Sequence, residues 1–337
     1  MKLNFRRGSA FASQKAKDYL KDIDPKDIQN ITVIRHAAIG DFMNIRPFLI
    51  ELREFFPNAK VTISLIRSSM YGYPEDLVDN IKIDPKTKKK TTFFQRYKQI
   101  KELPNTDIIF DLTDSSLSLL ISVLSGAKLK VGYSYRDIRR MFYAVSTLRS
   151  DLVVEAQSVL HMLNILGAKT SRLLRYGLDE KYPKDVKKQI VYFAGASMDN
   201  KCWEKDKFKE VIDKLSDELK DYNHIILQGI GEHEKFLEIY EPLKSKKNVL
   251  LQETLSIDEV MQFLANSSCL VSNDTGVRNM AIATQTPTVG IFFMIPPFRY
   301  WPREEKHDVA YNVEYTSPSV EMVFDITKKL VNKLYEK

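Results

Sequence analysis

Short runs of aliphatic and β-branched residues alternate with longer stretches of helical spacing along most of this chain, and that alternation restricts its fold more than any other feature. Apolar runs of about four to eight residues are typical of buried strands, whereas apolar residues three or four apart over about ten residues or more are typical of helices. Such a chain folds into parallel sheets covered by helices on both faces, so we expect an α/β fold. The expected strands are 31–35, 61–66, 108–112, 130–132, 189–194, 224–228, 248–251, 269–272 and 288–292. The expected helices are 42–56, 115–125, 151–166, 205–219, 232–243, 257–266, 277–283 and 319–336.

The alternation occurs twice, which predicts two domains. The chain has 337 residues, more than one domain of about 100–200 residues usually holds. A polar stretch at 178–188 separates the two sets of strands. We therefore expect an N-terminal domain over 1–180, preceded within it by an extension at 1–30, and a C-terminal domain over 181–317. A last helix within 318–337 has no strand after it, and we expect it to pack back onto the N-terminal domain.

The composition is that of a soluble globular protein, with 44% hydrophobic and 28% charged residues. No apolar run approaches the roughly 18 residues that span a bilayer, and the first residues lack the apolar core of a signal peptide. The two cysteines, Cys202 and Cys269, have no metal-ligand spacing. We therefore expect a cytoplasmic protein that uses neither a metal nor a cofactor.

Positive charge is concentrated in the first half of the chain. The net charge is +7, but residues 1–180 carry +9 and the remainder −2. Local basic runs lie at 82–101 and at Arg136, Arg139 and Arg140. This asymmetry indicates an anionic partner, such as a membrane surface or a phosphorylated substrate, or else a solvated lysine-rich surface. No nucleic-acid-binding motif accompanies the charge, so we expect no specific nucleic acid.

Four small polar turns follow predicted strands, at the end of an open parallel sheet where ligands bind. The first turn contains His36, Gly40 and Asp41 and leads into a predicted helix. Gly40 permits a tight turn. Asp41 lies at the N-cap or in the first helical turn, where a carboxylate either caps the helix or faces a ligand. A single histidine in such a turn, as His36 is, is more often structural than catalytic.

The other three turns follow strands of the second half. The turn at 195–203 combines small residues, the Ser197 hydroxyl and the Lys201 charge before a helix, which is what a phosphate site needs. It is not a Walker loop. Paired glycines at 228–232 either make only a turn or approach a ligand. An Asp-Thr-Gly triplet at 274–276 predicts an anion or ribose site at a helix start, whereas an aspartic protease is excluded because that class is all-β and has two such triplets.

Together these turns resemble glycosyltransferase family 9, the lipopolysaccharide heptosyltransferase type. The resemblance covers about residues 31–302. The matching pieces, in the family's order, are Val33-Ile34-Arg35 through Gly40-Asp41, Pro57-Asn58-Ala59-Lys60, Asp111-Leu112, Val131-Gly132-Tyr133, Gly195-Ala196-Ser197 with Lys201 and Trp203, Asp274-Thr275-Gly276, and Thr286-Pro287-Thr288-Val289.

The resemblance implies a GT-B fold, in which two Rossmann-like parallel-sheet domains face a central cleft. It implies an inverting, metal-independent transfer of a sugar, in the first place heptose, from an ADP-sugar donor to a lipopolysaccharide core or related glycan. The implied partners are a nucleotide sugar and an anionic glycolipid or oligosaccharide, with a peripheral contact at the inner membrane. The alternatives are a transferase of the same fold with another nucleotide sugar and acceptor, and a degenerate, non-catalytic nucleotide- or carbohydrate-binding protein.

The resemblance also assigns roles to residues by position. Asp41 matches the family's catalytic base, and Ser197 and Lys201 match its diphosphate contacts. Leu255 falls where an apolar residue lies against the nucleotide base. The full set of implied donor-binding residues is Ser197, Lys201, Leu255, Asp274, Thr275, Gly276 and Asn279, supported by Gly40, Ala196 and Arg278.

Three departures from the family pattern fall at substrate-contacting places. Asn279 stands where the family usually has histidine, and we expect Arg278 to substitute for it in part. The segment 293–297 replaces a glycine-containing stretch, and Leu117 stands where a basic residue is common. The identity of the sugar and of the acceptor therefore stays open.

Overall fold

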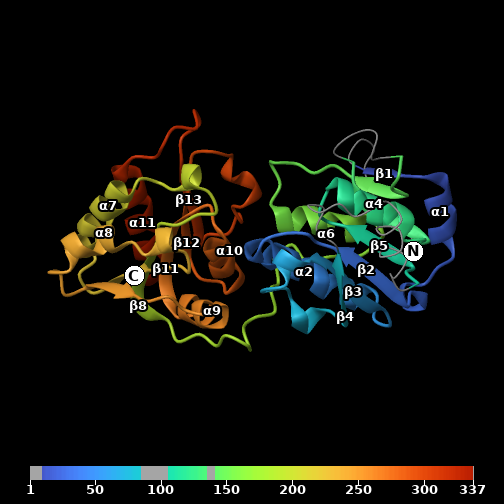
Figure 1. Cartoon of the computed structure of the whole chain (residues 1–337), viewed down its shortest axis with the longest axis horizontal. Coiled ribbons are helices and arrows are strands. Elements are labelled where there is room, and N and C mark those ends of the chain that lie inside the picture. Colours follow the sequence, from blue (N-terminus) through green and yellow to red (C-terminus); the bar gives the residue numbers. More distant parts are fainter. Residues whose placement is uncertain (1–9, 85–104, 135–140, 337) are drawn as a thin grey trace. The chain divides into compact units, whose positions relative to one another are not determined.

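The computed structural model describes residues 10–84, 105–134 and 141–336 of the chain. They form two compact units, Met1–Gly177 and Leu178–Lys337. Each unit is a mostly parallel sheet covered by helices, which confirms the predicted α/β class (Figure 1). Most of the basic run at 82–101, and Arg136, Arg139 and Arg140, lie outside the described residues. No helix in the described ranges combines the length and the apolar character needed to cross a membrane.

The sheet of the first unit has the described strand order β1-β7-β6-β5-β2-β3-β4. All neighbours are parallel except β1, which pairs antiparallel with β7. From the central strand β2 the chain builds outward to β3 and β4, and from β5 it builds the other way to β6 and β7. The strands are β1 (Ala10–Ala12), β2 (Asn30–Ile34), β3 (Lys60–Ile66), β4 (Asn80–Asp84), β5 (Ile108–Asp111), β6 (Leu129–Tyr133) and β7 (Val145–Thr147).

Helices cover both faces of this sheet. Right-handed crossovers place α2 and α4 on opposite faces, because β2 leads to β3 in one direction and β5 leads to β6 in the other. On one face α2 packs against α6, and on the other α4 packs against Ile34 and Ile109. The helices are α1 (Gln14–Lys21), α2 (Ile39–Phe55), α4 (Ser116–Leu124) and α6 (Glu155–Ile165).

The sheet of the second unit is parallel throughout, in the order β10-β9-β8-β11-β12-β13. It repeats the plan of the first sheet, with the order reversing between β8 and β11. Helix α7 packs against both α8 and α11, and α9 packs against α10 (Figure 1). The strands are β8 (Lys187–Phe193), β9 (Asn223–Leu227), β10 (Val249–Gln252), β11 (Ser267–Asn273), β12 (Thr288–Phe292) and β13 (His307–Tyr311). The helices are α7 (Lys205–Glu218), α8 (Leu237–Tyr240), α9 (Ile257–Ala265), α10 (Gly276–Ala283) and α11 (Val320–Tyr335).

The structure departs from the expected elements where a segment is very short or lies at a sheet edge. The edge strands β4 and β13 and the three-residue strands β1 and β7 were not predicted, since β4 and β13 mix charged and apolar residues and β1 and β7 are too short for an apolar run. The expected helix at 232–243 is broken into short pieces, because Phe236 adopts a left-handed φ of 49° and Pro242 cannot continue an α-helix hydrogen-bond ladder.

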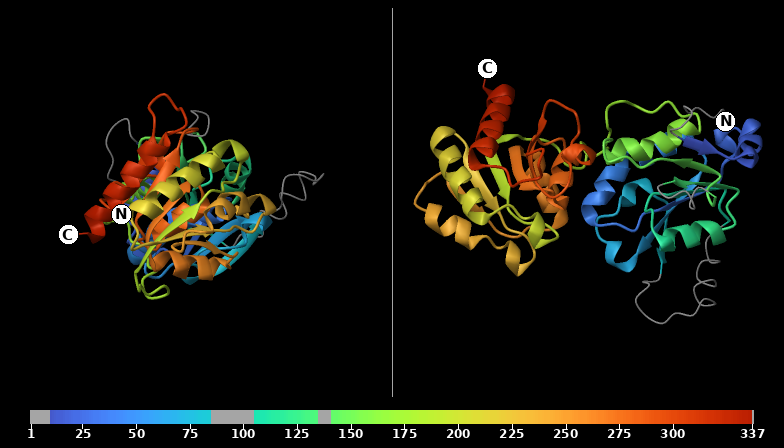
Figure 2. Two further views of the ribbon diagram at one scale, coloured as in Figure 1. Left: turned by 90° about the vertical axis from the view of Figure 1, so that its left-hand side faces the viewer. Right: turned by 90° about the horizontal axis from the view of Figure 1, so that it is seen from above.

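The last helix also differs from the prediction. We expected α11 to pack on the N-terminal domain, but it lies against α7, β12 and β13 of the second unit (Figure 2). Its apolar face, with Val320, Val323, Leu330 and Val331, is buried there. Burying each such side chain stabilises the unit by about 1.5–3 kcal/mol. The helix therefore belongs to the core of its own unit.

A buried histidine in the second unit is held as the neutral tautomer. His224 on β9 has no exposed surface. Its Nδ1 lies 2.8 Å from the Tyr192 hydroxyl and its Nε2 lies 3.2 Å from the carbonyl oxygen of Leu219. Nε2–H donates to the carbonyl, so Nδ1 accepts from the hydroxyl. Burial lowers the pKa of His224 to about 4, because the charged imidazolium has no water around it.

This pKa predicts a loss of stability in acid. The unfolded chain binds a proton near the ordinary histidine pKa of about 6.5 and the folded one does not, so stability falls as pH drops from about 6.5 towards 4. We expect His224→Gln to remove about 2 kcal/mol of the difference in unfolding free energy between pH 7 and pH 4.5. Urea unfolding followed by tryptophan fluorescence measures it, since Trp203 and Trp301 both lie in the second unit. The exposed His233→Gln serves as control and should unfold with the pH dependence of the natural chain.

Candidate functional site

Each sheet has one place where the strand order reverses. The turns that contain Asp41, Lys201 and Asp274 lie at these two places. In the first sheet β2 and β5 are neighbours, and in the second sheet β8 and β11 are neighbours. Helices leave such a pair in opposite directions, so a crevice opens at the carboxyl ends of the two strands. The turn with Asp41 follows β2, the turn with Lys201 follows β8, and the Asp274 triplet follows β11.

Asp41 lies in the first turn of α2, three residues after Ala38. Its Oδ2 accepts a hydrogen bond from the Ala38 backbone N–H at 3.3 Å. Its Oδ1 lies 3.4 Å from Nη2 of Arg35, and its side chain keeps 32% of its surface exposed. The helix N-terminus and the arginine both place positive charge beside this carboxylate. Asp41 thus supports the helix start, as the capping alternative predicted, and also presents a charged carboxylate at the edge of the sheet.

His36 ties three strand ends together. Its Nε2 lies 2.9 Å from Oδ2 of Asp84, the last residue of β4, and its backbone N–H donates to the Thr113 hydroxyl at 2.8 Å. The Ser64 hydroxyl on β3 donates to the same oxygen of Asp84. His36 and Asp84 are both largely shielded from solvent. These contacts are those of a residue that organises the turn around Asp41.

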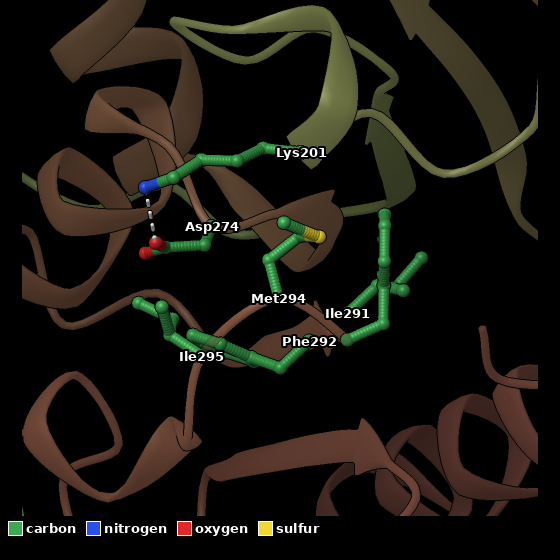
Figure 3. A pocket seen from close by; sticks show the side chains of 7 residues that line it. Lys201, Asp274, Ile291, Phe292, Met294 and Ile295 are labelled. Carbon is green, nitrogen blue, oxygen red and sulfur yellow. Dashed lines mark hydrogen bonds and ion pairs between the residues drawn. The ribbon is translucent and has the colours of Figure 1, made fainter. Parts of the chain in front are cut away.

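The second place combines a cation with the start of a helix. Nζ of Lys201 lies 3.2 Å from Oδ2 of Asp274, and both side chains are partly exposed (Figure 3). Thr275 is the N-cap residue of α10, which begins at Gly276. Backbone N–H groups at a helix start favour anions, and Lys201 adds a positive charge. This arrangement suits a phosphate group.

An open pocket of about 190 Å³ lies beside this ion pair. Its opposite wall is apolar and comes from the end of β12 and the segment after it. Figure 3 shows Met294, Phe292 and Ile295 around the space next to Lys201 and Asp274. The lining residues are Lys201, Asp274, Ile291, Phe292, Phe293, Met294 and Ile295.

Asn273, which the sequence analysis did not single out, joins the two turns of this site. Its Nδ2 donates to the carbonyl oxygen of Ala194 at 2.7 Å, and its Oδ1 accepts from the backbone N–H of Trp203 at 3.0 Å. Trp203 is fully buried and donates through Nε1 to the carbonyl oxygen of Pro318. An amide side chain at the end of the buried strand β11 was the signal that the sequence offered. Asn273 therefore fixes the Lys201 turn against the Asp274 turn.

The remaining predicted donor residues lie at the same edge of the second sheet. Ser197 is exposed in the turn after β8, Ala196 is buried beside it, and Leu255 is half-buried in the loop after β10. Asn279 lies on α10 and is largely buried, one turn after the helix start at Gly276. Their roles as ligand contacts stay predictions.

Arg278 does not take the role that the sequence predicted. Its side chain is only 1% exposed, so it does not reach a ligand in place of a missing histidine. Its Nη1 donates to the carbonyl oxygen of Tyr300 at 2.6 Å, and its guanidinium carbon lies 5.2 Å from the centre of the Phe292 ring. The absence of a side chain at Gly290 provides space for this guanidinium, since a Cβ there would lie 2.4 Å from Nε of Arg278. Arg278 supports the segment after β12 from inside the unit.

Clusters of metal-ligating side chains and reactive cysteine thiols are two further kinds of chemical site. No group of three or more histidine, cysteine, aspartate or glutamate side chains is placed to hold a metal in the part of the chain that the structure describes. Burial raises the pKa of the Cys202 thiol, which disfavours the reactive thiolate. Asp41 and the Lys201–Asp274 pair are thus the chemically distinctive groups at the two strand-order reversals.

Comparison with known proteins identifies the family. The sequence profile of glycosyltransferase family 9 (heptosyltransferase) matches residues 96–329, more than half of the chain. The chain belongs to glycosyltransferase family 9. It is therefore a heptosyltransferase-like glycosyltransferase, as the motifs predicted. Lipopolysaccharide heptosyltransferase 3 of Escherichia coli K12 is 22% identical over 275 residues, which cover 75% of this chain and 79% of that protein.

Solved structures of family 9 proteins share the fold of this transferase. E. coli heptosyltransferase WaaC with ADP-2-deoxy-2-fluoro heptose aligns with a TM-score of 0.69 at 15% identity, covering 89% of this chain and 99% of that one. The family 9 glycosyltransferase of Veillonella parvula DSM 2008 aligns with a TM-score of 0.71 at 17% identity, covering 92% and 99%. These likenesses confirm the predicted GT-B fold.

The role of Asn273 in this family 9 transferase can be tested by stability. Asn273→Ala leaves a buried N–H and a buried carbonyl without their partner, at about 1–3 kcal/mol each, so we expect unfolding to become easier by about 2–5 kcal/mol. Urea unfolding followed by tryptophan fluorescence measures this change. Asn312→Ala is the control, because the half-buried amide of Asn312 can exchange its bonds to Thr316 and Ser317 for water. Equal stability of the two variants would show that Asn273 does not fix the turns.

Proposed function

We propose that this protein is an inverting, metal-independent glycosyltransferase that moves heptose from an ADP-sugar to a lipopolysaccharide core or related glycan. The observation that carries the proposal is the Lys201–Asp274 pair at the start of α10, at the strand-order reversal of a family 9 fold. A relative of the same fold is described as binding ADP-2-deoxy-2-fluoro heptose, and another acts in lipopolysaccharide heptosylation by its name.

The second unit supplies the groups that a sugar diphosphate needs. Lys201 is partly exposed, so its ammonium group can exchange Asp274 for a phosphate oxygen. The N–H groups at the start of α10 and the Ser197 hydroxyl offer further donors. As the bond from the sugar to the diphosphate breaks, negative charge grows on the leaving oxygen, and these donors stabilise it. Lys201 and the helix N-terminus then supply the positive field that a divalent ion provides in other transferases.

The first unit supplies the base. The ionised Asp41 carboxylate accepts the proton of the acceptor hydroxyl while the hydroxyl oxygen bonds to the anomeric carbon. The bond to the diphosphate breaks in the same displacement, and the diphosphate carries the electron pair away. One displacement inverts the anomeric centre. The proton ends on Asp41, and the leaving charge ends on the nucleotide.

The acceptor and the site of action follow from charge. Residues 1–180 carry a net charge of +9, which suits an anionic glycolipid or oligosaccharide acceptor. The same charge suits a salt-sensitive, peripheral contact with an anionic inner membrane from the cytoplasmic side.

A second candidate, transfer of a different nucleotide sugar, is favoured by the pocket wall. Met294 and Ile295 face the space beside Lys201, and Phe293 also lines the pocket. Their apolar groups do not hydrogen-bond the hydroxyls of a heptose. Asn279 in place of histidine also lacks a charge. A sugar with fewer hydroxyl groups fits such a wall better. The third candidate is a non-catalytic binding protein. Such a protein has no use for a base, so it does not explain why Asp41 is retained together with Lys201.

A transfer assay in the presence of EDTA separates these candidates. Purified protein is given ADP-heptose, ADP-glucose or UDP-sugars with a lipopolysaccharide core acceptor, and nucleotide release and product mass are measured. Transfer of heptose supports the proposal, and transfer of another sugar supports the second candidate. Binding without turnover of any donor supports the third. Loss of turnover in EDTA that magnesium or manganese restores would overturn metal independence.

Asp41→Asn tests the base. The amide keeps the shape and the start of α2 but cannot take the acceptor proton, so we expect transfer to fall at least about 100-fold with near-normal donor affinity. The measurement is the rate of transfer at saturating donor. Asp27→Asn is a matched control, because Asp27 accepts from the Asp24 N–H at 3.3 Å just as Asp41 accepts from Ala38. A folded Asp41→Asn protein with the normal rate would place the base elsewhere, and an unfolded one would leave capping as its role.

Lys201→Ala tests the donor site. A charged hydrogen bond to phosphate contributes about 1.5–3 kcal/mol, so we expect ADP to bind about 10- to 100-fold more weakly. Isothermal titration with ADP measures the affinity, and the transfer rate should fall as well. The control is Lys209→Ala on α7, whose ammonium group pairs with exposed Asp206. Unchanged ADP affinity in Lys201→Ala would mean that the phosphates bind at another place.

A further inference from the structure

Four charged side chains form a cluster at the carboxyl end of the first sheet. Arg35 follows β2, Asp41 lies in the first turn of α2, Arg149 lies two residues after β7, and Glu155 is the first residue of α6. Arg35 Nη2 lies 3.4 Å from Asp41 Oδ1, and Arg35 Nη1 lies 3.4 Å from Glu155 Oε1. Arg149 Nη2 lies 2.9 Å from the same oxygen of Glu155. We call these four residues the arginine–carboxylate cluster.

The two middle members of the cluster are more deeply buried than the two at its ends. The side chains of Glu155 and Arg35 are 1% and 4% exposed, and those of Arg149 and Asp41 are 19% and 32% exposed. Arg35 Nη1 also donates to the carbonyl oxygen of Leu112 at 2.5 Å. Glu155 and the carbonyl oxygen of Leu112 after β5 thus hold Nη1 of Arg35, while Nη2 of Arg35 is directed to Asp41.

Stability alone is a weak explanation for this arrangement. Removing two charges from water is costly, and apolar side chains of similar volume often stabilise a fold equally well. The cluster has the geometry of a support for its exposed member. Asp41 is held at both oxygens, by a hydrogen bond from the Ala38 N–H to Oδ2 and by the ion pair of Oδ1 with Arg35, and the two contacts together restrict the plane of its carboxylate.

We propose that Arg35 is a positioning residue for Asp41, and that Glu155 and Arg149 hold Arg35 in place for this task. The proposal rests on the proposed function, in which Asp41 is the base. Arg35 fixes the carboxylate so that a free lone pair meets the acceptor hydroxyl, and small displacements of a reacting group are costly in rate. A cation this close also opposes proton transfer to Asp41. Glu155 partly neutralises the positive charge of Arg35 and so weakens its opposition to proton transfer.

Glu155 has a second effect when the proton moves. As Asp41 takes the acceptor proton it becomes neutral, and Arg35 would then be a buried cation facing a neutral partner. The ion pair with Glu155 remains, so the guanidinium keeps a charged partner throughout the step. Two other titratable groups, Asp111 and Tyr133, lie near the cluster. Asp111 accepts from the Tyr143 hydroxyl at 2.5 Å, and burial and Glu155 raise the pKa of Tyr133, so that phenol stays neutral.

The first test compares two buried arginines of the same unit. Arg35→Gln removes the contact with Asp41, whereas Arg46→Gln removes an arginine on α2 that is equally buried but is held by Asp76 and the carbonyl oxygen of Tyr176. We expect Arg35→Gln to lower kcat by about 10- to 100-fold, with donor KM within about twofold of normal. Arg46→Gln should lose stability but keep its kcat. Arg35→Lys, which keeps the charge, should recover part of the loss.

A double-mutant cycle ties the effect to Asp41. In an Asp41→Asn background Arg35→Gln should lower kcat no further, because the supported group has gone. If Arg35→Gln fails to fold, Glu155→Gln takes its place, with Glu51→Gln as control, since Glu51 is a largely buried glutamate paired with Arg175. Glu155→Gln should lower kcat at unchanged donor KM, and Glu51→Gln should not.

Two outcomes separate the failure of this inference from that of the proposed function. If Asp41→Asn transfers normally, the proposed base is wrong and the inference falls with it. If Asp41→Asn is inactive but Arg35→Gln and Glu155→Gln only lose stability and keep kcat, the base stands and the positioning role is overturned. Equal losses of kcat in Arg35→Gln and Arg46→Gln would likewise show a general structural effect.

Discussion

Parallel strand pairing is the constraint on which the rest of this protein depends. Parallel neighbours require a crossover over one face of the sheet, and the hand of that crossover is fixed. A chain that builds outward from β2 and then from β5 must therefore place α2 and α4 on opposite faces, and the second unit repeats this from β8 and β11. The ends of the two central strands are then left without a covering helix. Both candidate sites arise there, from turns that need to be short and polar because they lie at a solvent-facing edge.

The carboxyl-end edges of the two sheets present charges of opposite sign. At the first, a partly exposed carboxylate is backed by a buried arginine and a buried glutamate, so negative charge is presented outward and compensated inward. At the second, a lysine and a helix N-terminus present positive charge, and a carboxylate within 3.2 Å compensates it. A glycosyl transfer needs both kinds of group, one to accept a proton and one to stabilise a leaving diphosphate. The division between two similar sheets lets each turn be shaped for one task.

The features that depart from the family pattern concern the donor pocket more than the base. Asp41, Lys201 and the Asp274 triplet are retained, while the wall formed by Phe293, Met294 and Ile295 is apolar and Asn279 replaces a histidine. Arg278 does not compensate, since its guanidinium is buried against Phe292. In the proposed function, proton transfer and recognition of the sugar therefore depend on different residues. The chain can keep the reaction of its family while the wall of the pocket changes which sugar fits.

The sequence alone determined the α/β class, the two-domain plan and the family, because periodicity records which segments are buried and motifs at strand ends follow in a set order. It also placed Asp41 and Lys201 at the ends of β2 and β8, since each follows its strand within a few residues. Only the tertiary structure decided what those side chains meet. Arg35 and Glu155 are 120 positions apart, and Asn273 and Trp203 are 70 apart, so no local pattern pairs them. The same reason explains the misplaced α11 and the buried Arg278. An apolar face or a charge in the sequence states what must be satisfied, but packing between distant segments selects the partner that satisfies it.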